Sequence, residues 1–527
     1  MGYQIMTITQ PIQSLVQAAL QESREKEIDP NEPKISITTR ASKATFVYER
    51  MRNSVDYKEE HLVRRNAIER ILRRMLASDN REDLAENLIN ELIHARYLPN
   101  DIIPQRKIGE LEKIFEKYFA LLGLAPLKDI HNTQSLSSWT LGIMATEIDE
   151  FLVPPHLMHA SINTMYEYMQ SKLHIEDEIS LQERHKQVYI ASSRSLYKND
   201  EDTLKYHLFI TYYPEWPSAD KNLIKKIGAH LQDIRSQIDT DLNHPLKEKL
   251  TTTFRKHVGY FSVLSEIISH NPGNAWSDLH IPNQFETRIQ EICKKKYLES
   301  RAALHRGITR SIIYLVLTKF LIAIILEIPI EYFILQDFDY IPLLINLIFP
   351  PSLLAVIALS TKLPDDENTK QMIAGISNII EGKGDIIQMR KTKQRGFIMQ
   401  TIFVLSYGIL FLLSFGVLIY ILQLLNFSII GILIFLFFLS LVSLFAYRIR
   451  LTNQELIVTP PKKGIIRGLW SFFTIPVLHA GKWMSTRFAK INVFIFVLDF
   501  VIEAPFKAFI KIIEEWMNYV HEKKEEI

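Results

Sequence analysis

Lys319, Glu327 and Asn346 lie inside long apolar stretches of the sequence, where charged and amide side chains are energetically expensive. Such groups at membrane depth bind ions or relay protons, so they are candidates for intramembrane chemistry. Pro350 and Pro351 follow Asn346 in the same stretch and remove two backbone donors, which kinks a helix and leaves carbonyls that could coordinate a substrate. These five residues form the candidate site.

Each of these residues also has a structural interpretation. Lys319 is nine residues from Arg310, about 13 Å at helical rise, so its flexible stem could extend to the headgroups. Glu327 and Glu331 lie one turn apart near the outer end of their stretch, a position that favours the interface over an ion path. For the proline pair, a structural kink or a re-entrant hairpin is preferred to the broken helix of a transporter binding site.

The segment "EIDEFLVPPHLMH" contains metal-ligand residue types, namely Glu147, Asp149, Glu150, His156 and His159. The two histidines could share a helical face, but the Pro-Pro pair places the acids on a different helix. The chain has one Glu-x-x-His, at Glu91 and His94, where a di-iron bundle uses two, and no zinc motif. We therefore predict no metal site and no cofactor; a membrane-bound metal enzyme is a third hypothesis and would require His156.

No catalytic signature occurs elsewhere in the sequence. The chain lacks GxSxG, kinase and Rossmann motifs, and "GISNIIEGKGD" at 375–385 lacks phosphate-loop spacing, which favours a small amphipathic helix. A stripe of arginines alternates with glutamates, a pattern typical of a solvated, salt-bridged face and otherwise of a partner or lipid contact. The stripe consists of Arg64, Arg65, Arg70, Arg73, Arg74 and Arg81.

Four apolar stretches position the candidate site: 309–335, 340–360, 397–425 and 428–447. Each is close to the roughly 20 residues that a helix needs to cross about 30 Å of hydrocarbon. The last two contain no formal charge, and a buried helix of a soluble protein rarely stays apolar on all faces for so long. The sequence therefore predicts a multi-pass protein with four transmembrane helices.

The loops between these stretches predict the orientation. Lysines and arginines precede the first stretch, fill the loop between the second and third, and follow the fourth, whereas the other two loops have none. Basic residues are retained on the cytoplasmic side during insertion. We therefore expect a protein of the cell membrane with both termini in the cytoplasm.

The flanking regions are predicted to be helical as well. Residues 1–38 suggest a short helix and a flexible segment, 39–306 a cytoplasmic helical domain, and 448–527 a cytoplasmic or interfacial region. In the last region, residues 491–520 form an amphipathic pattern that would lie on the bilayer or pack on the domain. Only 204–213, "LKYHLFITYY", shows the alternation of a strand.

Together these patterns predict an all-α protein with a large soluble helical domain, a four-helix transmembrane region over 309–447 and a C-terminal amphipathic helix. Residues 1–300 are mildly acidic, which argues against a nucleic-acid partner, and the bilayer is the expected contact of the basic remainder. We expect a membrane-anchored scaffold or assembly factor that binds a protein partner or a second copy. The alternative is a small oligomeric transporter or channel that uses Lys319 and the Pro350-Pro351 region.

Overall fold

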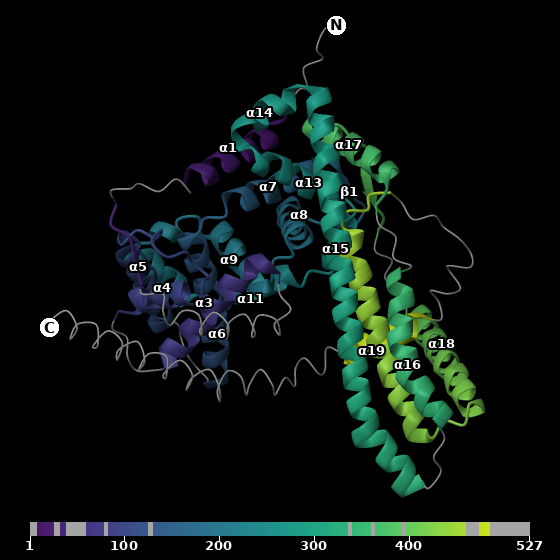
Figure 1. Ribbon diagram of the computed structural model, residues 1–527. Helices are drawn as coiled ribbons and strands as arrows, with labels where there is room; N and C mark the ends of the chain where they lie inside the picture. Colours follow the sequence, from purple (N-terminus) through teal and green to yellow (C-terminus); the bar gives the residue numbers. More distant parts are fainter. Residues whose placement is uncertain are drawn as a thin grey trace, which may run out of the picture.

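The computed structural model describes residues 8–25, 32–37, 59–77, 83–124, 130–335, 340–359, 364–391, 397–459 and 474–484. Within these ranges the chain is almost entirely helical, which confirms the predicted all-α class. Figure 1 shows a helical domain from which one long helix, α15 (Pro282–Ile322), extends into a second group of helices. The predicted amphipathic helix at 491–520 lies outside the described residues, as does the charged stretch at 38–58.

A first core is formed by helices that lie between residues 63 and 152 and between residues 201 and 242. Apolar residues at helical spacing face inward, as at Leu88 and Leu92 of α4 and Leu111 and Phe115 of α5, all of which are buried. The helices of this core are α3 (Val63–Ala77), α4 (Leu84–His94), α5 (Arg106–Leu124), α6 (Ile130–Leu152), α9 (Glu201–Tyr212), α10 (Lys221–Ala229) and α11 (Leu231–Leu242), with short 3-10 turns at η1 (Glu60–Leu62) and η2 (Trp216–Ser218).

A second core includes the start of the helix that continues into the apolar bundle. It contains α1 (Gln10–Glu25), α7 (His156–Lys172), α8 (Leu181–Leu196), α12 (Lys247–Arg255), α13 (Val258–His270), α14 (Pro272–His280), the start of α15, α17 (Asp366–Ile380) and the strands β1 (Leu173–Ile175) and β2 (Ile387–Met389). Side-chain caps start several of these helices. Ser180 accepts from the backbone N–H of Glu183 in α8, and Asp365 accepts from that of Asn368 in α17.

Helix α1 differs from the sequence-based division of the chain. We predicted a short helix in a segment separate from the domain, but Ile12, Leu15 and Val16 are buried in the second core against α7. The backbone N–H of Thr9 also donates to the carbonyl of Ile380 at 3.1 Å. Residues 8–25 therefore pack as part of the domain.

Several helix boundaries also differ from expectation. The alternating segment 204–213 falls largely in α9, so the strand interpretation is wrong there. Among the described residues, β1 and β2 form a parallel pair that sequence patterns did not indicate. The predicted boundary between residues 306 and 309 falls inside α15, which is one helix of 41 residues and about 60 Å.

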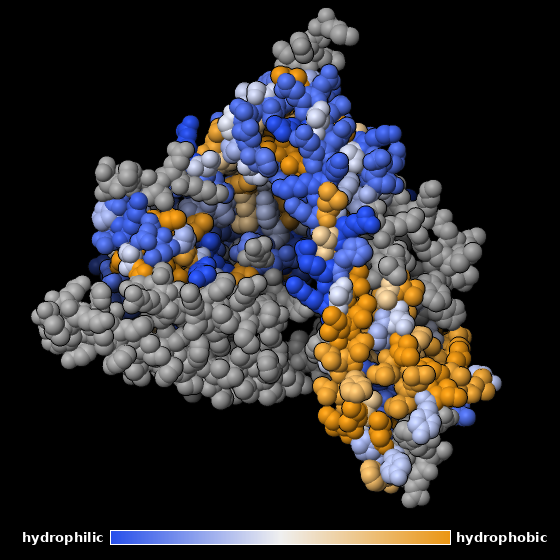
Figure 2. All heavy atoms as spheres, viewed as in Figure 1, coloured by the Kyte–Doolittle hydropathy of each residue, from blue (hydrophilic) through white to orange (hydrophobic). Residues whose placement is uncertain are grey.

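The apolar helices form a bundle at the far end of α15. In the described residues, three helices are long and apolar enough to cross a membrane, within Pro282–Ile325, Ile398–Leu424 and Ile429–Ala446. A fourth apolar helix, Tyr340–Val356, is shorter. Figure 2 shows apolar side chains covering this end, where Ile398, Leu412 and Ile429 are more than 70% exposed, whereas the domain surface is mainly polar. The bundle comprises the end of α15, the π-helices η3 (Ala323–Glu327) and η4 (Ile330–Leu335), α16 (Tyr340–Leu359), α18 (Phe397–Leu424) and α19 (Ile429–Gln454).

Two segments that follow apolar helices return to the domain. Helix α17 buries Met372, Ile376 and Ile379 in the second core; it begins before the small helix predicted at 375–385 and ends at Ile380. Its Gly375 lies against Tyr260 of α13, and a Cβ at this position would overlap the tyrosine ring. The side chain of Asn368 then accepts from the N–H of Val458 and donates to the carbonyl of Leu456, both at 2.8 Å, so residues after α19 also meet the domain.

Candidate functional site

Lys319 and Glu327 form an ion pair inside the apolar bundle. The Lys319 Nζ lies 2.6 Å from Glu327 Oε1, and the two residues are separated by eight positions along the chain. The π-helix η3 lies between them, closed by a bond from the N–H of Ile328 to the carbonyl of Ala323. A π turn is wider than an α turn and changes the direction of the residues beside it.

Asn346 of α16 completes a polar trio with this pair. Its Nδ2 donates to Glu327 Oε1 at 2.7 Å and approaches the carbonyl of Gly431 in α19 at 3.5 Å. The Lys319 ammonium also lies 4.6 Å from the ring centroid of Phe438 in α19, a cation–π distance. Lys319, Glu327 and Asn346, called the polar trio below, therefore join three segments of the bundle.

The enclosure of Lys319 corrects one sequence-based interpretation. Lys319 is 0% exposed and its ammonium pairs with Glu327, which is 2% exposed, so the lysine does not extend to the headgroups. The side chain of Glu331 lies outside the described part of the structure. Since isolated charges are costly in an apolar medium, the pairing of opposite charges explains how both residues are accommodated.

The proline pair does not break its helix. Helix α16 runs from Tyr340 to Leu359 with Pro350 and Pro351 inside it, both buried, so the re-entrant hairpin is wrong. Proline lacks an N–H, and Pro350 is four residues after Asn346, so the Asn346 carbonyl has no helical donor from that position. Of the five candidate residues, Lys319 and Asn346 thus both contact Glu327. The two prolines lie about one helical turn after Asn346.

The polar trio can hold α15, α16 and α19 in one arrangement, because a charge-assisted hydrogen bond in an apolar environment is strong and directional. One polar atom does not take part: Asn346 Oδ1 is buried and has no hydrogen-bond partner among the described residues. Sequence reasoning found the three residues by their polarity, but not their pairing.

Comparison with known proteins gives no further assignment. The chain matches no family model, no curated protein and no solved structure. Its function has to be argued from its own residues.

Glu147 and Asp149, which were considered as metal ligands, are occupied by other partners. Glu147 is buried and accepts from Lys117 Nζ at 2.5 Å, Tyr118 Oη at 2.7 Å and Trp216 Nε1 at 2.8 Å. Asp149 lies 2.5 Å from Arg64 Nε. These contacts tie α6 to its neighbours, and we assign both carboxylates to packing.

Glu150 and His159 do meet, although the sequence placed them on separate helices. The chain turns at Pro154 and Pro155 between α6 and α7, and Glu150 Oε1 lies 3.2 Å from His159 Nε2. His207 of α9 approaches the same oxygen at 2.7 Å through its Nε2. His156 instead contacts Glu25 of α1 at 3.0 Å, so the two histidines of α7 serve different partners. Sequence analysis missed His207 because it lies in the segment considered as a strand.

Electrostatics favour the ionised form of Glu150. Burial alone would raise its pKa, but the charge and hydrogen bonds of His207 and His159 outweigh this and lower the pKa to about 2. Glu150 is therefore a carboxylate at neutral pH.

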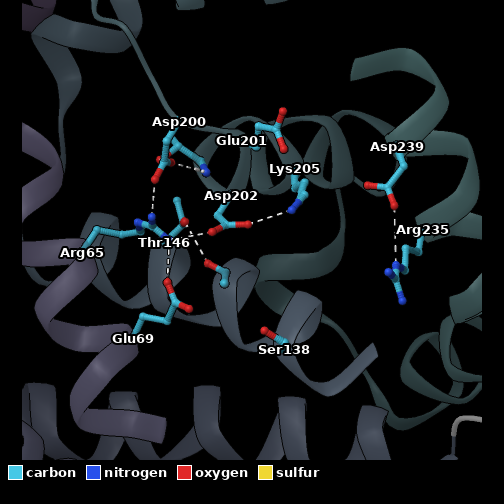
Figure 3. Close-up of polar contacts among 12 residues, drawn as sticks. Arg65, Glu69, Ser138, Thr146, Asp200, Glu201, Asp202, Lys205, Arg235 and Asp239 are labelled. Carbon is cyan, nitrogen blue, oxygen red and sulfur yellow. Dashed lines mark hydrogen bonds and ion pairs between the residues drawn. The ribbon is translucent and has the colours of Figure 1, made fainter. Parts of the chain in front are cut away.

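Part of the arginine stripe is buried, which corrects its interpretation as a solvated face. Arg65 is 2% exposed, and its guanidinium contacts Glu69 Oε2 at 3.1 Å, Asp202 Oδ2 at 3.3 Å and the carboxylate of Asp200. Figure 3 shows these groups converging from α3 and from the start of α9, with Lys205 on the far side of Asp202. Arg65 thus holds α3 to the N-terminus of α9, which carries His207.

Proposed function

We propose that this chain is a membrane-anchored scaffold or assembly factor whose helical domain binds a protein partner on the cytoplasmic side of the cell membrane. Four helices would serve as the anchor, with both termini in the cytoplasm. The domain accounts for about half of the chain and contains two packed cores, far more than a tether needs.

Contacts of the loops support four crossings. The segment at 364–391 follows two apolar stretches and packs on the domain through α17 and β2. Residues 455–459 follow two more and also reach it, with Glu455 2.9 Å from Lys198 Nζ. A chain that returns to the same side of a bilayer has crossed an even number of times. Two crossings before 364 and two more before 455 satisfy this condition.

The closed polar trio is the observation that favours an anchor over a pathway. Lys319 and Glu327 neutralise each other and are excluded from solvent. Phe438, whose ring lies 4.6 Å from the Lys319 ammonium, belongs to an apolar cluster with Leu315, Leu354 and Val442. An ion path needs sites that exchange with water, whereas this arrangement holds helices together.

Affinity purification after mild crosslinking in native membranes tests this proposal. The wild type should recover a stoichiometric protein partner or a second copy of the chain. The double variant Lys319→Met/Glu327→Leu serves as a matched control, because a scaffold needs its domain and not the trio, and it should recover the same partner. If the wild type recovers no stoichiometric partner, the proposal is refuted.

A second candidate, a small oligomeric transporter or channel, is favoured by Asn346 Oδ1, which lies beside a π-helix and has no partner within the described ranges. Buried polar atoms without partners and π turns are both frequent at functional sites. Lys319→Leu would then abolish cation or proton flux into proteoliposomes while the protein stays folded. Equal flux in wild type and Lys319→Leu would exclude this candidate.

A further inference from the structure

Three metal-ligating side chains converge in the helical domain, each from a different helix. Glu150 comes from the end of α6, His159 from the first turn of α7 and His207 from the middle of α9. One ligand atom from each lies within 4.8 Å of the other two. We propose that Glu150, His159 and His207 bind one divalent first-row transition-metal ion, with Zn²⁺ as the best match.

The spacing of the ligand atoms fits such an ion. Zinc binds nitrogen and carboxylate oxygen at about 2.0–2.2 Å, so two ligands in a tetrahedral site lie roughly 3.3 Å apart. Glu150 Oε1 is 3.2 Å from His159 Nε2 and 2.7 Å from His207 Nε2. A shift of about half an ångström would bring His207 Nε2 to this spacing from Glu150, and the ligand atoms of the two histidines lie no more than 4.8 Å apart. The two imidazole rings meet edge to face, with centroids 5.1 Å apart.

The chemistry of the three ligands selects the class of metal. Two imidazoles and one carboxylate suit zinc and the neighbouring transition metals, whereas Ca²⁺ and Mg²⁺ prefer sites made of oxygen ligands. Two histidines and a glutamate also form the protein ligand set of open zinc sites, in which water takes the fourth position. Water could reach the fourth coordination position from the side of His159, whose side chain is 37% exposed, whereas that of His207 is 6% exposed.

Surrounding contacts hold two of the ligands in place. The Tyr189 hydroxyl lies 3.5 Å from His207 Nδ1, on the ring nitrogen that a metal at Nε2 would leave free. Arg64 contacts Asp149, the residue before Glu150, and Arg65 fixes the start of α9. These contacts orient Glu150 and His207 toward each other, which lowers the cost of organising a site.

The position of the ligands suggests what the ion would do. Glu150 and His207 belong to helices of the first core, whereas His159 belongs to α7 of the second core. A bound ion would therefore connect the two cores at the point where the chain turns from α6 to α7. We infer a structural role in joining them, with an open coordination position facing solvent.

Metal binding can be tested on the full-length chain, purified in detergent with a tag that contains no histidine. The wild type should take up one Co²⁺ per chain with visible d–d absorption, and Zn²⁺ should displace it and raise the melting temperature. The variant His159→Ala should lose both effects, and its partial exposure makes a folding defect small. His156→Ala, one turn earlier on the same helix, should behave as the wild type.

A second variant, Glu150→Gln, allows the test to be completed if His159→Ala is unstable. Glu150→Gln preserves shape but removes the anionic ligand, so its affinity for Co²⁺ should fall at least tenfold. The proposal is overturned if wild-type protein binds less than half an equivalent of Co²⁺ and Zn²⁺, or if His159→Ala and Glu150→Gln bind as tightly as His156→Ala. Preference for Ca²⁺ or Mg²⁺ over Zn²⁺ would overturn it as well.

Discussion

Removing one charge of the polar trio should destabilise the bundle far more than removing both. In Glu327→Leu the ammonium of Lys319 would stay buried without its counter-ion, and in Lys319→Met the carboxylate of Glu327 would stay buried without its cation. Breaking a buried pair from one side costs about 3–5 kcal/mol. Because both side chains are almost fully buried and 2.6 Å apart, we expect each single variant to lose at least about 3 kcal/mol of unfolding free energy.

The double variant Lys319→Met/Glu327→Leu should be close to the wild type. Replacing a buried ion pair by apolar residues of similar volume is often neutral or stabilising, since neither charge has to be desolvated. If the singles cost about 3 kcal/mol each and the double almost nothing, the coupling energy is roughly 6 kcal/mol. Asn346 loses its acceptor at Glu327 in Glu327→Leu and in the double variant alike, so this cost cancels from the coupling energy.

Reversible unfolding in lipid bicelles, followed by steric trapping, can measure this cycle. Leu321→Met is a suitable control, since this residue is 54% exposed on the same helix and the change should cost less than about 0.5 kcal/mol. A coupling energy below about 1 kcal/mol is typical of solvent-exposed ion pairs. That result would refute the dry, locked bundle on which the anchor proposal depends.

Three further predictions concern the domain. Arg65→Met should cost about 3 kcal/mol, because three carboxylates lose their shared cation, and chemical denaturation of the full chain would measure this. Burial raises the pKa of Asp202, but Lys205 and Arg65 outweigh it and lower the pKa, so its contribution to stability is present above about pH 4 and lost as the pH falls through the lower folded value. The stability difference between wild type and Asp202→Asn should therefore shrink below pH 4 in unfolding curves. Gly375→Ala should cost about 1–3 kcal/mol, because its Cβ overlaps Tyr260, and hydrogen exchange should show faster opening of α17.

Polarity within apolar sequence was enough to select the trio. Lys319, Glu327 and Asn346 are conspicuous because such residues are rare at membrane depth. The pairing of Lys319 with Glu327 was not predictable, because residues eight apart lie about 12 Å apart along a regular α-helix. The π-helix that ends at Glu327 was not indicated by the sequence pattern. The interpretation of Lys319 as a snorkelling residue failed for the same reason: its partner was not visible.

Tertiary contacts explain the remaining errors. Arg65 lies in a stripe of alternating charges, and nothing in that local pattern distinguishes a buried arginine from exposed ones. The acids that bury it, Asp200 and Asp202, are more than 130 residues away. Likewise, His207 meets Glu150 only because α9 packs on α6. Local sequence was enough to predict which segments are helical. The partners of individual side chains depended on how helices far apart in the sequence pack together.

The pairing of β1 with β2 has a consequence for biogenesis. β1 is made early, but β2 and α17 emerge from the ribosome only after the first two apolar stretches. Met372, Ile376 and Ile380 of α17 fill the second core, so this core cannot close on the nascent chain before those stretches have left the ribosome. Until then its apolar face stays open to chaperones. Completion of the domain would therefore report that the first two apolar stretches have been synthesised.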